Sequence, residues 1–386
     1  MENSTAPIYF DYNATTPVDP EVFAAMEPYF KQHFGNPASA GHTWGWAAEA
    51  AVVKGREQVA QLIGAKSQEV IFTSGATESN NWAIFGLLSK LRENNPQEPV
   101  HFITSNVEHS SIMKGMAALT RWNVDVTFLP VDHNGQVQVE QVKKALRPHT
   151  RMMSFIWVNN EIGTINPIAE LAALAKENKI YFHTDATQAA GKIPMNVTDM
   201  GIDLMSFSAH KIYGPKGVGA LYIRGKDPKV QLDPLIYGGG QERGLRSGTV
   251  NVPGVVGFGK AAELCKKNQA QESAKLRELS QTLWKELQAA IPGVKLNGHP
   301  TERAANNLNI TLPGAKTEKL MSHLQKLGVS TGSACGTGAM VISHVLTGIG
   351  LSPEEVQCSL RLSLGRWTTR EEISRAVDIL KEGISK

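Results

Sequence analysis

The chain has 386 residues, with 39 Lys and Arg against 36 Asp and Glu, so its formal net charge is +3. At roughly 100–200 residues per domain, this length predicts two or three structural units. The near-balanced charge, with no basic block, argues against a protein dedicated to nucleic-acid binding. Hydrophobic residues make up 41% of the chain, which argues against long disorder and against a fibrous protein.

The cysteines and the N-terminus indicate a reducing compartment. Cys265, Cys335 and Cys358 are too few for a disulfide scaffold, and their spacing matches no metal site. An odd number of thiols in a chain of this length is typical of the cytosol, where thiols stay reduced. No apolar run approaches the ~18 residues that span a bilayer, and the N-terminus lacks the pattern of a signal peptide. We therefore expect a soluble cytoplasmic enzyme without a metal site or a membrane segment.

Short apolar runs alternate with longer amphipathic runs between about residues 18 and 255. Helices are expected between several of the apolar runs, for example from about Thr77 and over residues 169–179. Strand followed by helix in alternation predicts an α/β domain over residues 18–255, with a mainly parallel seven-stranded sheet between helices. The strand candidates are residues 70–73, 100–104, 124–129, 152–158, 180–184, 204–208 and 219–223.

The pattern changes after the turn expected at Pro253-Gly254. Residues 307–312 and 359–364 alternate like half-buried strands, and a final helix is expected from about Arg370 to Ile384. This predicts a smaller α+β domain over residues 256–386, joined by the N-terminal segment 1–17. Its long helix carries one apolar stripe, made of Leu276, Leu279, Leu283 and Leu287 at helical spacing.

Lys211 follows the strand candidate at residues 204–208 and precedes a glycine-rich turn. Burial at a strand end lowers the pKa of a lysine amine and frees it for Schiff-base chemistry. Ser206, Ser208 and His210 just before it are donors for a phosphate. The alternative is a lysine that only extends its amine to solvent.

Asp185 stands at the carboxyl end of another strand candidate, where α/β sheets place their ligands. Pyridoxal phosphate enzymes need an acidic partner for the pyridinium nitrogen. Asp185 suits that role, with Gln188 near the phenolic oxygen of the ring. The alternative is that Asp185 only caps a helix.

Two further segments offer groups for such a cofactor. Ser74-Gly75-Ala76-Thr77 joins a strand to a helix start, where free N–H groups and the helix dipole favour a phosphate. His109 follows the strand candidate at residues 100–104, and its imidazole is suited to lie on an aromatic ring and to move protons; alternatively, it is a solvated loop histidine. The chain has no nucleoside-triphosphate loop and no convincing dinucleotide fingerprint.

Cys335 lies among glycines and small residues, which predicts an accessible loop whose thiol becomes a nucleophile if its pKa is lowered. Cys265 and Cys358 are expected to be structural. Arg361 alternates with Leu360 and Leu362, so inward-facing leucines would turn its guanidinium to the other face of the strand. There it can bind a substrate carboxylate through two hydrogen bonds. The alternatives are an accidentally exposed thiol and an ordinary surface arginine.

Taken together, these motifs resemble the cysteine desulfurases, pyridoxal phosphate enzymes of aminotransferase class V and fold type I. The resemblance extends from Asp11-Tyr12-Asn13 to the closing helix, and the residues after Cys335 resemble the long-loop group that supplies sulfur for iron–sulfur cluster assembly. It also rests on Gly35-Asn36-Pro37, Gly75-Ala76-Thr77-Glu78-Ser79, Glu108-His109, Asn159-Asn160-Glu161, Asp185-Ala186-Thr187-Gln188, Ser208-Ala209-His210-Lys211, Arg246-Ser247-Gly248-Thr249 and Gly332-Ser333-Ala334-Cys335.

The resemblance implies pyridoxal 5′-phosphate as the cofactor and L-cysteine as the substrate. It implies that Lys211 binds the cofactor covalently and that Cys335 takes the sulfur as a persulfide, for transfer to an acceptor such as an iron–sulfur scaffold protein. L-alanine is the other product. The remaining implied contacts are Asp185, Gln188, His109, Ala76, Thr77, Ser208 and His210 to the cofactor, Thr249 to its phosphate from the second subunit of a homodimer, and Asn160 and Arg361 to the substrate carboxylate.

Three rival functions stay open at this point. A selenocysteine lyase or an aminotransferase of the same fold would use the same cofactor, but an aminotransferase needs no Cys335. A sulfur-relay scaffold with little turnover of its own would not need Lys211, Asp185 and Arg361 together. The sulfur acceptor also stays open, because Gly336-Thr337-Gly338 replaces the serine-rich run of housekeeping relatives, and their C-terminal extension does not follow Ile384.

Overall fold

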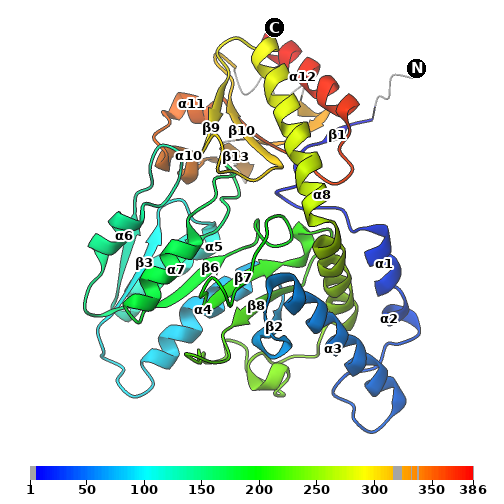
Figure 1. Cartoon of the computed structure of the whole chain (residues 1–386), viewed down its shortest axis with the longest axis vertical. Helices are drawn as coiled ribbons and strands as arrows, with labels where there is room; N and C mark the ends of the chain where they lie inside the picture. The colour runs from blue at the N-terminus through cyan, green and yellow to red at the C-terminus, as the bar shows by residue number, and fades with distance from the viewer. Residues whose placement is uncertain (1–5, 316–323, 332, 337–338, 386) are drawn as a thin grey trace.

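The computed structural model describes residues 6–315, 324–331, 333–336 and 339–385, with the backbone alone at residues 333–336, 339–341 and 385. A seven-stranded sheet forms the centre of the larger part of the molecule (Figure 1). β8 is antiparallel to both of its neighbours, and the other neighbouring pairs are parallel. In spatial order the strands are β2 (Val70–Thr73), β8 (Gly219–Ile223), β7 (Leu204–Ser208), β6 (Tyr181–Asp185), β5 (Thr150–Ile156), β3 (Val100–Ser105) and β4 (Val124–Leu129).

Alternate residues of these strands pack into two different apolar clusters. On β2, Val70 and Phe72 belong to one cluster and Ile71 to the other, as a side-chain period of two requires. Because both faces are covered, most of these strands are buried along nearly their whole length, and their apolar residues stand out in the sequence. The predicted α/β architecture is confirmed. One face packs against α3 (Thr43–Ile63), α6 (Val139–Ala145), α7 (Ile168–Glu177) and the start of α8, and the other against α4 (Ala76–Leu91) and α5 (Ser110–Ala118).

The smaller part of the molecule is built on a four-stranded antiparallel sheet, which agrees with the predicted α+β character. β1 (Ile8–Tyr9) pairs with β11 (Leu327–Gly328), so the N-terminal segment joins this part. A separate two-stranded pair is formed by β13 (Ser333–Gly336) and β14 (Ala339–Ile342). The four-stranded sheet has the order β12 (Ser330–Thr331), β15 (Ser359–Ser363), β10 (Asn307–Thr311) and β9 (Lys295–Asn297), and α12 (Arg370–Ser385) packs against it. α10 (His344–Gly348) and α11 (Pro353–Gln357) pack in a separate cluster with Val107 and Ile162.

One helix, α8 (Val252–Ala290), runs through both parts (Figure 1). Its first half, to Cys265, packs in the core of the large sheet, and its second half, from Leu276, packs against α12 and the small sheet. The predicted turn at Pro253-Gly254 is wrong, because these residues form the first turn of α8. Proline is tolerated there, since the N–H it lacks has no partner in a first helical turn, and the Asn251 side chain accepts from Gly254 N. The domain division at residues 255 and 256 stays a prediction.

The remaining short elements lie mostly around the large sheet. α1 (Pro20–Met26) and α2 (Pro28–Lys31) contact α8. Short 3₁₀ turns occur at Ser67–Glu69, Leu119–Trp122, Ala209–Lys211 and Glu242–Gly244. None of the helices in the described ranges combines the length and the apolarity that crossing a bilayer requires.

Candidate active site

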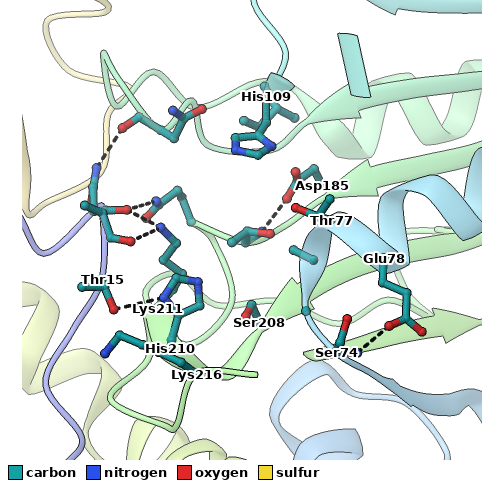
Figure 2. Close-up of a pocket in the computed structure, with 18 of the residues that line it drawn as sticks. Thr15, Ser74, Thr77, Glu78, His109, Asp185, Ser208, His210, Lys211 and Lys216 are labelled. Carbon is teal, nitrogen blue, oxygen red and sulfur yellow. Dashed lines mark hydrogen bonds between the residues drawn. The ribbon is translucent and has the colours of Figure 1, made fainter. Parts of the chain in front are cut away.

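A cavity of about 620 Å³ opens at the carboxyl ends of the parallel strands (Figure 2). Residues after β2, β3, β5, β6 and β7 line it, as does Arg361 of β15 from the smaller sheet. Strands that run in parallel bring their ends to one edge, which explains why residues far apart in the sequence meet here. Among the predicted site residues, the lining contains Ala76, Thr77, His109, Asn160, Asp185, Gln188, Ser208, His210, Lys211 and Arg361.

One side of the cavity has the properties of a phosphate cradle. Gly75 precedes α4 with φ 156° and ψ 176°, a conformation almost restricted to glycine, and the first N–H groups of the helix lie beside the cavity. The backbones of Gly75 and Gly219 also approach each other closely, because a Cβ added at Gly219 would lie 2.6 Å from the Cα of Gly75. Ser208, His210 and Lys216 line the same cavity, so neutral donors and a cation surround an anion site.

Lys211 follows β7 on a 3₁₀ turn and faces the cavity together with His210 (Figure 2). Its Nζ donates to the carbonyl oxygens of Asn13 and Ala14, at 2.6 Å each. Burial and the charge of Arg361 lower the pKa of this amine to about 8, against the opposite effect of Asp185. A substantial fraction of Lys211 is therefore neutral and nucleophilic near pH 8.

Asp185 is buried at the end of β6, and its carboxyl is held from two sides. Asn80 Nδ2 donates to Oδ2 at 2.7 Å, and the backbone N–H of Thr187 donates to Oδ1 at 2.9 Å. Residues 187–192 form turns, so Asp185 caps no helix. The sequence did not point to Asn80. In the structure this asparagine is fully buried on a helix, and a buried amide needs a specific hydrogen-bond partner.

His109 is linked to Asp185 through the same asparagine. Asn80 Nδ2 also donates to Ser111 Oγ at 2.8 Å, and Ser111 Oγ lies 2.7 Å from His109 Nδ1. The backbone N–H of Ser111 also donates to that ring nitrogen. Because Nδ1 accepts these bonds, Nε2 is the ring nitrogen left for other contacts. The imidazole is thus held in place, which a solvated loop histidine is not.

Arg361 stands between buried Leu360 and Leu362 and faces the cavity, as the alternation predicts. Its Nη2 donates to Asp11 Oδ1 at 2.7 Å and to Ser330 Oγ at 2.6 Å, and its Nη1 donates to the carbonyl oxygen of Asn160 at 3.0 Å. Three buried polar atoms of cavity-lining residues have no partner in the described part of the chain. They are Arg361 Nε, Asn160 Oδ1 and Thr187 Oγ1, and such atoms indicate a bound ligand.

Thr249 is exposed and does not line the cavity of its own chain. The segment before it is fixed, because Arg246 binds Glu78 through Nε at 2.9 Å and Nη2 at 3.2 Å. Burial of Glu78 opposes ionisation, but the bonds from Arg246 and Ser74 outweigh it and lower the pKa of Glu78. The predicted contact of Thr249 with the cofactor phosphate of a second subunit stays a prediction.

The three cysteines differ in their surroundings. Cys335 lies on β13 opposite Met340 of β14, and its side chain is outside the described residues. The predicted loop at this cysteine is therefore a strand at the level of the backbone. Cys265 is buried, which raises its pKa to about 12, and burial also raises the pKa of Cys358. Both of these thiols stay protonated at neutral pH, in agreement with structural roles.

Comparisons with known proteins identify the family to which this arrangement belongs. Residues 8–376 match the family model for aminotransferase class V. The chain belongs to this family. A cysteine desulfurase IscS of Rickettsia typhi is 45% identical over 386 residues, which are 100% of this chain and 93% of that protein.

Solved structures of similar proteins agree with the class V fold. A structure described as a NifS-like protein matches with a TM-score of 0.90 at 36% identity, covering 98% of this chain and 99% of that one. A structure described as SspA in complex with cysteine matches with a TM-score of 0.81 at 38% identity, covering 94% of this chain and 100% of that one. The predicted family and fold are confirmed.

In this class V chain, the sequence did not reveal how Asn13 connects the site. Its carbonyl oxygen accepts from Gln188 Nε2 at 2.8 Å as well as from Lys211, and its side chain donates to the carbonyl oxygen of Asn160. Lys192 Nζ donates to Gln188 Oε1 at 2.6 Å, and burial followed by the charge of Lys211 lowers the pKa of Lys192 to about 7. The place of Asn13 in the Asp11-Tyr12-Asn13 motif was the sequence feature that could have indicated its role. Lys192 belongs to none of the motifs, so nothing in the sequence indicated its role.

Glu108 is a second residue to which the sequence assigned no role, and it is fully buried next to His109. Ser105 Oγ donates to its Oε1 at 2.5 Å, and its Oε2 has no partner in the described part of the chain. Burial raises the pKa of Glu108 to about 8, although the bond from Ser105 acts the other way. The carboxyl therefore keeps its proton at neutral pH, beside the carboxyl of Asp185.

This gives a testable dependence of stability on pH. Between the ordinary pKa of 4.5 and the raised value of about 8, the unfolded chain binds fewer protons at Glu108 than the folded chain. The free energy of unfolding must therefore fall as pH rises through this range. In E108Q this contribution is absent, so the variant should gain stability relative to the wild type between pH 5 and pH 8, by at most about 5 kcal/mol.

Urea unfolding of both proteins at the two pH values measures the difference. The control is E278Q, which changes an exposed glutamate of α8 and should show no such trend. A stability difference between E108Q and the wild type that is the same at pH 5 and pH 8 would contradict the prediction.

Proposed function

We propose that this protein is a pyridoxal 5′-phosphate-dependent cysteine desulfurase, which converts L-cysteine to L-alanine and passes the sulfur to an acceptor protein. The observation that carries the proposal is one cavity containing a lysine of lowered pKa, a buried aspartate, a helix N-terminus and an arginine. Further support comes from the full-length similarity to a cysteine desulfurase IscS and to a structure of SspA with cysteine.

The residues of the cavity fit the cofactor. The Gly75–Thr77 turn, Ser208 and His210 would hold its phosphate, and Asp185 would meet the ring nitrogen. His109 and Gln188 line the same space, with Lys211 as the covalent attachment. When bound, pyridoxal phosphate supplies a ring that accepts the electron pair released at the α-carbon of the substrate.

Arg361 and Asn160 are placed to bind the substrate carboxylate. The guanidinium has a free Nε, and Asn160 has an unpaired side-chain oxygen, so both have capacity for a ligand. The Lys211 amine, with its pKa of about 8, takes and returns a proton at the substrate carbons. Fixed orientation of the carboxylate places the sulfur in one position, which is a large part of such catalysis.

Cys335 is the proposed sulfur carrier. Its thiolate forms an S–S bond to the substrate sulfur while the C–S bond of L-cysteine breaks and its electron pair stays with carbon. Protonation of that carbon completes L-alanine, so one L-cysteine and one thiol give one L-alanine and one persulfide. The outer sulfur then moves to the thiol of an acceptor, for which we propose a protein of the iron–sulfur scaffold type.

The test is turnover of L-cysteine by the protein loaded with pyridoxal phosphate, with dithiothreitol as the final sulfur acceptor. Alanine and sulfide should form in equal amounts without any keto acid. Alanine formation that requires a keto acid would instead indicate an aminotransferase. A strong preference for selenocysteine over cysteine would indicate a selenocysteine lyase.

We also propose that two chains form a homodimer. Several aromatic side chains in residues 23–46 are more than half exposed, which is unusual for a surface without a partner. They are Phe23, Phe30, Phe34, Trp44 and Trp46. Light scattering should give the mass of two 41.9 kDa chains, and a mass of one chain at micromolar concentration would contradict the proposal.

A further inference from the structure

The β13–β14 pair, whose backbone carries Cys335, is flanked by two serines that contact the edge of the active site. Ser330 lies on β12 before it, and Ser343 follows β14 directly. From these contacts we propose that Ser330 and Ser343 are positioning residues that hold the β13–β14 pair in place for sulfur transfer to Cys335. The proposal rests on the proposed desulfurase function and adds a role for residues outside the cavity lining.

The first anchor is Ser330. Its Oγ donates to Asp11 Oδ1 at 2.9 Å and accepts from Arg361 Nη2 at 2.6 Å. Ser330 is also paired with Arg361 along the antiparallel β12 and β15 strands. The strand that leads toward Cys335 is therefore bound, through its side chain and its backbone, to the arginine proposed to bind the substrate.

The second anchor is Ser343. Its Oγ donates to Glu161 Oε2 at 2.5 Å and accepts from the backbone N–H of Leu346, so it also caps α10. The next residue adds a contact, because His344 Nε2 lies 2.8 Å from the carbonyl oxygen of Glu108. Both partners are next to proposed site residues in the sequence, because Glu161 follows Asn160 and Glu108 precedes His109.

Glu161 is a firm support because its own backbone is held. Its N–H donates to Asn159 Oδ1 at 2.9 Å, and its carbonyl oxygen accepts from the side chains of Asn307 and Asn309. Both serines donate to carboxylate oxygens, and hydrogen bonds to charged groups are stronger than neutral ones. Fixing both ends of a short segment reduces the number of conformations that it can adopt.

The two anchors should differ in their effect on substrate binding. Ser330 shares Arg361 Nη2 with Asp11, so its loss changes the orientation of the guanidinium that receives the substrate carboxylate. Ser343 touches no group that we assign to the substrate. S330A should therefore raise KM for L-cysteine and slow sulfur transfer, whereas S343A should slow sulfur transfer with KM nearly unchanged.

The experiment compares S343A with S352A in the pyridoxal phosphate-loaded protein. Ser352 caps α11 as Ser343 caps α10, since its Oγ accepts from the backbone N–H of Glu355. The two serines differ in that Ser343 Oγ also donates to Glu161, next to the proposed site residue Asn160. Two quantities are measured: persulfide at Cys335 by mass spectrometry after rapid mixing with L-cysteine, and hydrogen exchange of residues 339–342 without substrate. E161Q and the double variant S343A/E161Q complete a cycle.

We expect S343A to slow persulfide formation and to speed hydrogen exchange, each by about tenfold, the effect of losing one hydrogen bond to a charged group. S352A should match the wild type in both. The double variant should be no slower than S343A, because S343A removes the bond that E161Q only weakens by taking the charge from its acceptor. Wild-type behaviour of S343A, or equal losses in S343A and S352A, would overturn the proposal.

Failure of the proposed function would look different. If wild-type Cys335 gains no persulfide from L-cysteine, the desulfurase assignment is wrong. The hydrogen-exchange comparison, which needs no substrate, then decides alone whether the anchors hold the β13–β14 pair.

Discussion

Cys335→Ser should stop sulfide release from L-cysteine while the protein still binds pyridoxal phosphate. A hydroxyl is a much weaker nucleophile than a thiolate, and it cannot take up sulfur as a persulfide. The expected loss is at least about 10³-fold in the rate of sulfide formation, the scale found when a covalent nucleophile is removed. The measurements are sulfide and alanine formed from L-cysteine, together with the visible absorbance of the bound cofactor.

The matched control is Cys358→Ser. The Cys358 thiol donates to the carbonyl oxygen of Ala315 at 2.9 Å, and a serine hydroxyl can keep that bond. This variant should retain most of its activity, because burial raises the pKa of Cys358 and keeps the thiol protonated. Full activity in C335S, or a loss in C358S equal to that in C335S, would move the sulfur carrier away from Cys335.

The strands of the large sheet were predictable from their short apolar runs, which reflect burial on both faces in most strands, although β4 is partly exposed. β2, β4, β7 and β8 begin and end at the predicted residues, and each is bounded by turn-forming or polar residues. The site followed from the same signal. Asp185, His109 and Lys211 stand at or just after strand ends, and parallel strands bring their carboxyl ends to one edge.

Contacts between distant segments were not predictable in the same way. Asn13 bonds to Gln188 and Lys211, and Asp11 bonds to Arg361, across about half the chain or more. A sequence pattern gives the period and the ends of an element, but not its register against another element hundreds of residues away. Motif residues such as Asn13 were therefore visible as candidates, but their partners were not.

The segment around Cys335 was misjudged for a local reason. Its glycines and small side chains favour a loop, but Val341 and Ile342 on the other strand are β-branched residues, which favour extended backbone. The pairing of Ser333–Gly336 with Ala339–Ile342 depends on both halves together. The glycines around Cys335 were therefore a weaker indication of the backbone structure than the pairing of the two halves.

Lys211→Ala should abolish both the covalent attachment of pyridoxal phosphate and the turnover of L-cysteine. Attachment needs a neutral amine next to the cofactor aldehyde, and Lys211 Nζ is the cavity-lining amine with a lowered pKa. Borohydride reduction of the wild-type holoenzyme should place the cofactor on the peptide that contains Lys211, and K211A should carry none. Capture of added cofactor by the wild-type apoprotein should accelerate with rising pH and level off above about pH 8, where the amine is mostly neutral.

Lys192 is the rival lysine, and it makes the test a strict one. Its pKa is lowered to about 7, yet it lies outside the lining of the large cavity and donates to Gln188 instead. Because the charge of Lys211 is one cause of that low value, K211A should raise the pKa of Lys192 and leave it more often protonated. Lys192 should therefore be a worse substitute in the variant than its wild-type pKa suggests. Cofactor found on Lys192 after reduction of the wild-type protein would refute the assignment, whereas K192A should keep the covalent bond at Lys211.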